Sequence, residues 1–290
     1  MKNRIILLWG CAVWMSGCND WMDIEPEDQR LAQEYWTEED DVHTTVISCY
    51  VRLRECLEKI VQWGEIRADV FQISNKTSLE ESIKMKEQNL DSDNSIVKWD
   101  PFYKVINSAN AVIKYAQLVV ARDPNFTEEK MNQYVAEAKT VRALAYFILV
   151  RSFKEVPLIL EPYTTDTQVF EQPKATEEEI LNQLLIDLRW SMKRLKDKHF
   201  TDEKSSNFWQ DKSRATRWLG ASLMADIYLW TEQYAECIAA CNEVIGSGNF
   251  RLIAANLDIP EYENEKWYDI FGYGLTDESI FELFYNSNQK

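Results

Sequence analysis

Apolar residues recur with the period of an α-helix over most of the chain, and this pattern restricts the fold more than any other feature of the sequence. Long runs with this period predict helices at about 38–62, 99–120, 127–153 and 176–195. Glycine, which weakens helix interiors, occurs only eight times in 290 residues. We therefore expect a mainly α-helical fold.

Capping signals mark the start of two of these helices. Thr37 with Asp40, and Thr176 with Glu179, have the three-residue spacing of a capping box. In that motif the two side chains satisfy backbone N–H groups that the first turn leaves without partners. Both helices should therefore begin directly after the threonine.

The helical pattern is sharpest in residues 221–245. Small and aromatic residues line one helix, a short turn follows at 231–234, and a second helix ends at a glycine-containing stop at 246–248. Such a hairpin is typical of tetratricopeptide repeats, which bury their apolar faces by stacking. The predicted architecture is a tetratricopeptide-like helical superhelix with irregular loops.

Three segments depart from the helical pattern. Residues 63–98 and 255–276 lack a clear period and are interpreted as long loops, which often carry the function of a helical scaffold. Alternating apolar residues at 278–285 predict a short strand element, whose partner must lie elsewhere.

The N-terminus has the features of a lipoprotein signal peptide. Lys2 and Arg4 precede an apolar run over 5–14, and Ser16-Gly17 lead directly into Cys18. The run is too short to cross a bilayer as a helix, which takes about 20 residues. We expect residues 1–17 to be removed, Cys18 to carry the lipid that anchors the protein in a membrane, and residues 18–36 to form an acidic tether.

The charge of the chain restricts its partners. The formal net charge is −16, and loss of Lys2 and Arg4 with the signal peptide makes it −18. Such an acidic body repels phosphate backbones. Nucleic acid is therefore not an expected partner.

Four cysteines remain once Cys11 and Cys18 are set aside. Cys49 and Cys56 are about 10.5 Å apart along a helix, and Cys237 and Cys241 about 6 Å. Neither spacing favours a disulfide within one helix. We interpret all four as small buried apolar residues, although the sequence does not decide their redox state.

No catalytic or metal-binding pattern emerges from the remaining residues. His43 and His199 are the only histidines, and neither stands in a zinc or nucleophile motif. Carboxylates are too numerous in so acidic a chain to single out a glycosidase pair. We predict a binding protein rather than an enzyme, with no cofactor and no metal.

A series of short motifs resembles the SusD/RagB family of outer-membrane nutrient-binding lipoproteins, and their order along the chain makes the resemblance specific. The motifs are Cys18–Pro26, Tyr35–Asp40, Trp63–Asp69, Trp99–Tyr103 with Asn107–Asn110, Glu137–Ala143 with Tyr146-Phe147, Val156–Leu158, Ala225–Tyr228 with Tyr234, and Ser279–Glu282.

The resemblance implies a function. Members sit on the outer membrane, facing the cell exterior, as a lid over a SusC-like TonB-dependent transporter, to which they deliver captured oligosaccharides or, in some members, peptides. The sequence does not separate these two ligand classes, and a helical-repeat scaffold or a hydrolase remain alternatives. Members are also longer, so we expect the helical domain at 37–290 to be incomplete at its C-terminus.

The aromatic residues divide into packing and candidate binding residues. Trp267 and Tyr273, in the loop at 261–276, are proposed to stack on sugar rings, whose C–H faces complement aromatic rings, with Asn264 and Glu265 bonding hydroxyls. Phe271 is expected to plug the core instead. Six tryptophans on or near helical stripes are assigned to packing: Trp36, Trp63, Trp99, Trp190, Trp218 and Trp230. Arg67 is expected to pair with a carboxylate.

Overall fold

The computed structural model describes residues 32–68, 70, 80–164, 171–199, 210–253 and 269–283. The chain divides into two compact units, Met1–Tyr35 and Trp36–Lys290. The first unit contains helix α2 (Ala32–Tyr35). All other described elements belong to the second unit.

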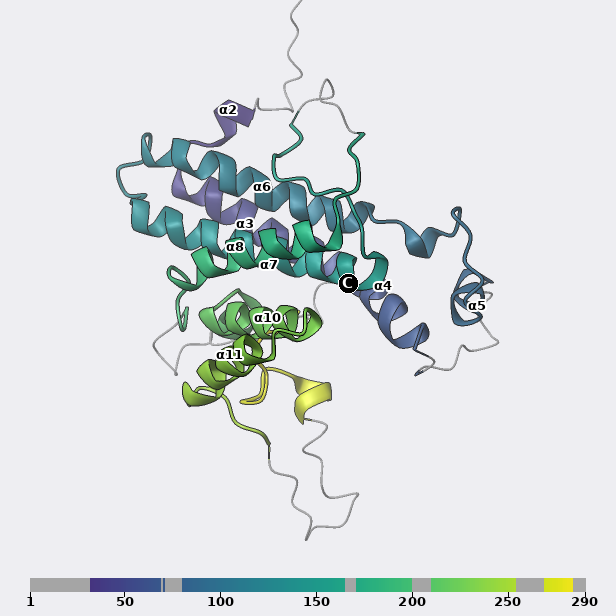
Figure 1. The fold of residues 1–290 in the computed structure, drawn as a ribbon. Helices are drawn as coiled ribbons and strands as arrows, with labels where there is room; N and C mark the ends of the chain where they lie inside the picture. Colours follow the sequence, from purple (N-terminus) through teal and green to yellow (C-terminus); the bar gives the residue numbers. More distant parts are fainter. Residues whose placement is uncertain are drawn as a thin grey trace, which may run out of the picture. The chain divides into compact units, whose positions relative to one another are not determined.

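Four long helices form the main layer of the second unit. They are α3 (Glu39–Glu55), α6 (Asp100–Val120), α7 (Glu128–Phe153) and α8 (Glu177–Met192). Helix α6 packs against both α3 and α7, and α7 packs against α8 (Figure 1). For α6, α7 and α8 these bounds confirm the helices predicted from the apolar period to within a few residues at each end. The single helix predicted at 38–62 is instead divided at Cys56 into α3 and a shorter helix, α4 (Leu57–Val61).

A helical hairpin follows the main layer. Helices α10 (Arg217–Trp230) and α11 (Tyr234–Gly246) pack against each other, and α10 also contacts α7 and α8. The short turn between them and the stop after α11 lie where the sequence placed them. The predicted tetratricopeptide-like, mainly helical fold is therefore confirmed.

Shorter elements occupy segments that were interpreted as loops. The segment 63–98 holds most of a π-helical turn, a two-turn helix and a 3-10 turn, so it is not a structureless loop. The short elements of the described chain, inside and outside this segment, are α4 (Leu57–Val61), η2 (Gln62–Ile66), α5 (Glu80–Lys86), η3 (Ser95–Val97), α9 (Gln210–Ser213) and η5 (Asp269–Tyr273).

The two capping predictions had different outcomes. At α8 the box forms as predicted, since Thr176 Oγ1 accepts from Glu179 N and Glu179 accepts from Thr176 N at 2.8 Å. At α3 the prediction was one residue early. Glu38 is the N-cap, and the Asp41 carboxylate accepts from its backbone N–H at 3.0 Å. The Asp41 carboxylate therefore takes the role that the spacing had assigned to Asp40.

The predicted strand at 278–285 does not form over its described part, which ends at 283. One backbone bond, from Glu282 N to Lys212 O at 2.7 Å, joins this part to another segment. The one β-bridge recorded in the described chain pairs Val156 with Ala175 instead. Alternation of apolar residues alone did not supply a partner with a matching edge.

A buried ionic cluster joins the long helices. The Asp187 carboxylate on α8 accepts from Arg142 Nη2 at 2.5 Å and from Lys139 Nζ at 2.6 Å, both on α7. Arg142 also donates to Asn110 Oδ1 on α6 at 2.7 Å, and Asn110 donates to the Ile159 carbonyl. These bonds link three helices and the segment after α7 through groups that solvent scarcely reaches.

The cysteines fall into two environments. Cys49 and Cys56 are buried in the core, and burial raises the pKa of each thiol to about 12. Cys241 is exposed and Cys237 partly exposed, which corrects the prediction that all four are buried. All four are free thiols. Cys237 and Cys241 lie on α11, the last long helix described. Their helical spacing resembles that of core residues, but no other described element buries this face of α11.

Within the described residues, no helix combines the length and the apolar character that crossing a bilayer requires.

Candidate binding site

Among the hollows in the described part of the helical unit, three are relevant to ligand binding. The first, called the aromatic pocket, has a volume of about 320 Å³. Its lining residues are Trp63, Arg67, Met85, Gln88, Leu90, Val97, Ser152 and Phe153. This volume falls inside the range of about 300–1,000 Å³ that is usual for ligand sites.

Aromatic stacking fixes the back wall of the aromatic pocket. The Trp63 ring stacks on Phe102 at 4.9 Å and meets the edge of Phe153 at 4.8 Å, while its indole N–H donates to the Ile96 carbonyl at 2.8 Å. Trp63 is therefore a buried packing residue, as predicted. Since Phe102 occupies one Trp63 face, Phe153, which is partly exposed, is the ring better placed to meet a ligand.

The rim of the aromatic pocket is polar. Gln88, two residues after the end of α5, adopts a left-handed backbone with φ of 57°, which is typical of a helix C-terminal stop. Arg67 donates to the Ser152 carbonyl at 3.4 Å, so its described partner is a backbone oxygen and not the carboxylate expected for it. Gln88 and Arg67 are both exposed and can offer an amide and a guanidinium to a ligand.

A second hollow is larger but shallow. It measures about 560 Å³ and is formed by Tyr103, Pro157, Ile159, Glu171, Gln172 and Pro173. The Tyr103 hydroxyl is already committed, because it donates to the Pro157 carbonyl at 2.7 Å. This hollow offers a ligand fewer enclosing walls than the aromatic pocket does.

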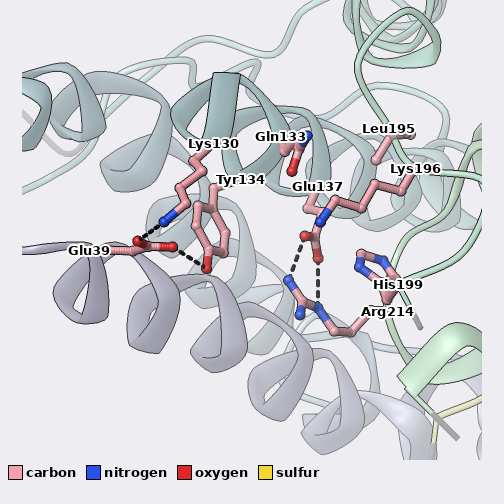
Figure 2. Close-up of a pocket in the computed structure, with 9 residues that line it drawn as sticks. All are labelled: Glu39, Lys130, Gln133, Tyr134, Glu137, Leu195, Lys196, His199 and Arg214. Carbon is pink, nitrogen blue, oxygen red and sulfur yellow. Dashed lines mark hydrogen bonds and ion pairs between the residues drawn. The ribbon is translucent and has the colours of Figure 1, made fainter. Parts of the chain in front are cut away.

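The third hollow, called the polar pocket, lies between α3, α7 and the segments after α8 and α9 (Figure 2). Its volume is about 140 Å³. Its lining residues are Glu39, Lys130, Gln133, Tyr134, Glu137, Leu195, Lys196, His199 and Arg214.

Ion pairs occupy both carboxylates of the polar pocket. Glu137, almost fully buried, accepts from Arg214 Nη2 at 2.6 Å and Nε at 3.1 Å, and from the Tyr50 hydroxyl at 2.9 Å. Glu39 accepts from Lys130 Nζ at 2.7 Å. Figure 2 shows the two pairs side by side at the pocket wall. The first pair anchors residue 214 to α7, and the Tyr50 hydroxyl extends the link by accepting from Ala215 N.

Burial shifts several pKa values around the polar pocket. It lowers the pKa of His199, although Glu137 acts in the opposite direction, and it raises the pKa of Tyr134 to about 12 with help from Glu39. For Arg214, burial lowers the pKa, but the Glu137 carboxylate and further partners outweigh it and the pKa is raised. At neutral pH the His199 ring is therefore uncharged while Arg214 keeps its charge.

The residues that the sequence singled out for binding lie mostly outside these hollows. Cys18 and Trp267 are outside the described residues, and of Tyr273 only the backbone, in η5, is described. Phe271 is 83% exposed, so it does not plug the core. Phe271 lies in the π-helical turn η5.

The helical tryptophans are buried to different degrees, and the partly exposed Trp230 still packs at right angles to the buried Phe147 ring, with 6.5 Å between the ring centres. Trp36, Trp63 and Trp218 are buried as predicted. Trp230 is 41% exposed and donates to Glu177 at 2.7 Å. The apolar period identifies the helix face of such a residue, but not how far the neighbouring helix covers it.

Sequence reasoning did not single out Gln88, Gln133 or Lys196, which line the hollows. These residues come together from segments far apart in the chain, and no local spacing marks them. For Lys196 a weak signal was present: it directly follows the end of a predicted apolar stripe, where a basic side chain is normally explained by the helix terminus.

The fold and the hollows define a class: an α-helical repeat protein with ligand-sized hollows and, in the described residues, no cluster of metal-binding side chains. The sequence profile of a SusD-like family, described as "Starch-binding associating with outer membrane", matches residues 20–229. The match covers well over half of the chain. The chain therefore belongs to this family.

Individual relatives agree with that assignment. A SusD-like protein P38 from Formosa agariphila is 25% identical over 267 residues, which are 91% of this chain and 47% of the relative. A crystal structure of a SusD superfamily protein from Bacteroides thetaiotaomicron has a TM-score of 0.68 at 21% identity, covering 76% of this chain and 50% of that one.

A further solved structure is described by the ligand that it binds. It is a "Laminarin binding SusD-like protein", with a TM-score of 0.66 at 22% identity over 85% of this chain and 51% of that one. At such identity the solved structures show the fold alone. The chain spans about half the length of the curated relatives it matches.

Proposed function

We propose that this protein captures oligosaccharides at the bacterial outer membrane and delivers them to a partner SusC-like TonB-dependent transporter, as a lipid-anchored binding protein and not an enzyme. The observation that carries the proposal is the family match over residues 20–229, since the family is described by starch binding and association with the outer membrane. The laminarin-binding relative of the same fold supports the ligand class.

The aromatic pocket is the described hollow that suits this function best. It combines apolar walls, against which the C–H faces of a sugar can pack, with the guanidinium of Arg67 and the amide of Gln88 for its hydroxyls. Donors on a rim can select a sugar by its hydroxyl geometry. We propose that the aromatic pocket binds one sugar unit of a longer oligosaccharide.

Trp267 and Tyr273 remain proposed stacking residues for sugar rings. The support for them is chemical: two aromatics stand in one segment with Asn264 and Glu265. The lipid on Cys18 and an exterior orientation belong to the same proposal, because a lid over a transporter must be held at the membrane surface.

Calorimetric titration of the soluble chain from Asn19 with an oligosaccharide panel tests the site. Arg67→Ala, Trp267→Ala and Tyr273→Ala should each weaken binding, whereas Arg251→Ala, an exposed arginine paired with Asp277, should not. Unchanged affinity in a folded variant removes that residue from the site. Peptides in the same panel test the peptide-capturing alternative.

Co-purification from membranes tests the partner. Gentle detergent extraction followed by affinity capture should recover a large outer-membrane barrel protein. Repeated recovery of the lipoprotein without such a partner contradicts the delivery step while leaving ligand capture to be decided by calorimetry.

A further inference from the structure

The polar pocket has more hydrogen-bond donors than its own acceptors use. Gln133 and Lys196 line it, and neither side chain makes a hydrogen bond or ion pair with another described residue. Arg214 donates from Nε and Nη2 to the Glu137 carboxylate, and its Nη1 has no described partner. In Figure 2 the unpaired groups and the ion pairs surround the same space.

The lining of the polar pocket carries a net positive charge, which is unusual in so acidic a chain. Three cations, Lys130, Lys196 and Arg214, face two carboxylates, Glu39 and Glu137, so the lining carries a positive excess although the whole chain has a formal net charge of −16. Both carboxylates are already engaged by Lys130 and Arg214. The positive charge of Lys196 is therefore the one without a counterion in the pocket.

The size of the polar pocket restricts its occupant. At about 140 Å³ it has less than half of the ~300 Å³ at which pockets for whole ligands begin, and it is several times larger than the ~30 Å³ of one water molecule. A charged substituent with a few carbon atoms fits this space. A complete oligosaccharide does not.

We propose that the polar pocket binds the carboxylate group of a small organic acid or acidic sugar, with Lys196 as its counterion and Gln133 and Arg214 Nη1 as further donors. This site is separate from the aromatic pocket and does not depend on the function proposed for it. A carboxylate supplies the acceptor oxygens that these donors lack, and charge-assisted bonds are the stronger kind.

His199 provides a reporter within the polar pocket. Its Nε2 lies 3.0 Å from the Ala215 carbonyl, and a carbonyl only accepts, so Nε2 carries the proton in the neutral ring. The charged groups around the ring are Glu137 on α7, Arg214, and Asp211, whose carboxylate accepts from the His199 backbone N–H. A bound anion beside this ring favours its protonated form and raises its pKa.

Calorimetry with sodium glucuronate, sodium acetate and neutral glucose at fixed ionic strength tests the proposal on the soluble chain from Asn19. Glucuronate should bind and glucose should not bind at this site. Acetate binding as well as glucuronate identifies the carboxylate alone as the recognised group; weaker acetate binding shows that the sugar ring contributes. Lys196→Met should weaken glucuronate binding about tenfold or more, the loss expected for one charge-assisted hydrogen bond.

The matched control is Lys198→Met, an exposed lysine two residues away that does not line the polar pocket. It should bind glucuronate like the wild type. Proton NMR of the histidine ring should show glucuronate raising the pKa of His199, with His199→Gln assigning the signal. No saturable glucuronate binding, equal binding of glucose, or affinity untouched by Lys196→Met would each overturn the proposal.

Discussion

The Asp187 carboxylate, 1% exposed, pairs with two cations, the buried Arg142 and the partly exposed Lys139. Asp187→Asn keeps the shape of the side chain but leaves Arg142 and Lys139 without their counterion. Breaking a buried pair in this way costs about 3–5 kcal/mol. We expect the free energy of unfolding, measured by urea denaturation, to fall by that order.

Asp226→Asn is the matched control for this substitution. Asp226 pairs with Arg151 at 3.2 Å, but both side chains are about half exposed, and such surface pairs contribute roughly 0–1 kcal/mol. Equal losses for the two substitutions would show that the Asp187 cluster is not what stabilises the junction of α7 and α8.

His199 links stability to pH. Burial lowers its pKa below the ordinary value of 6.5, so between that value and the lowered one the unfolded chain binds more protons than the folded chain. The stability that His199 contributes is complete above about pH 6.5 and is lost as the pH falls below it. Protonation must therefore oppose folding in mildly acidic buffer.

Urea denaturation of the wild type and of His199→Gln at pH 7.5 and 5.5 measures this effect. The glutamine amide can still donate toward the Ala215 carbonyl, so the two proteins should differ by no more than roughly 1–2 kcal/mol at pH 7.5. The variant should lose less stability on acidification. A parallel loss in both proteins would contradict the role of the His199 ring.

At the level of the helices, Thr176 and Glu179 close the first turn of α8 by a reciprocal cap. Thr176→Ala removes the side-chain acceptor for Glu179 N and should cost about 1 kcal/mol of stability. Thr44→Ala, at an exposed interior position of α3, removes no cap and should be neutral or slightly stabilising. Thermal unfolding of both variants decides whether the cap contributes.

The helices that the sequence predicted best are those whose signals are local. Periodic apolar residues mark α7 and α8, and the Thr176 cap marks the start of α8, without reference to the rest of the chain. The strand expected at 278–285 failed because a strand needs a partner edge, which its own residues do not specify. The predicted burial of Cys241 was wrong for a related reason. The spacing of apolar residues in α11 does not show whether another element covers that helix.

At the scale of the whole molecule, the hollows are the part that the sequence could not predict. The polar pocket combines Glu39, residues 130–137, Lys196 and Arg214, which only the packing of α3 and α7 with the segments after α8 and α9 brings together. The family resemblance, in contrast, is spread over many short motifs in order. The sequence alone is therefore enough to identify it.

Membrane attachment is tested at Cys18. The basic start, the short apolar run and Ser16-Gly17 predict that this thiol receives the lipid. Labelled palmitate should enter the wild type in cells and be absent from Cys18→Ser. Equal labelling of both proteins would contradict the proposed anchor.

Glycan capture is the central claim, and one calorimetric titration tests it most directly. The soluble chain from Asn19, with its helical content verified by circular dichroism, is titrated with a panel of neutral oligosaccharides and, in parallel, with peptides of similar size. We expect saturable binding of at least one oligosaccharide and no binding of the peptides. Peptide binding, or no oligosaccharide binding by a chain whose helices are intact, would contradict it.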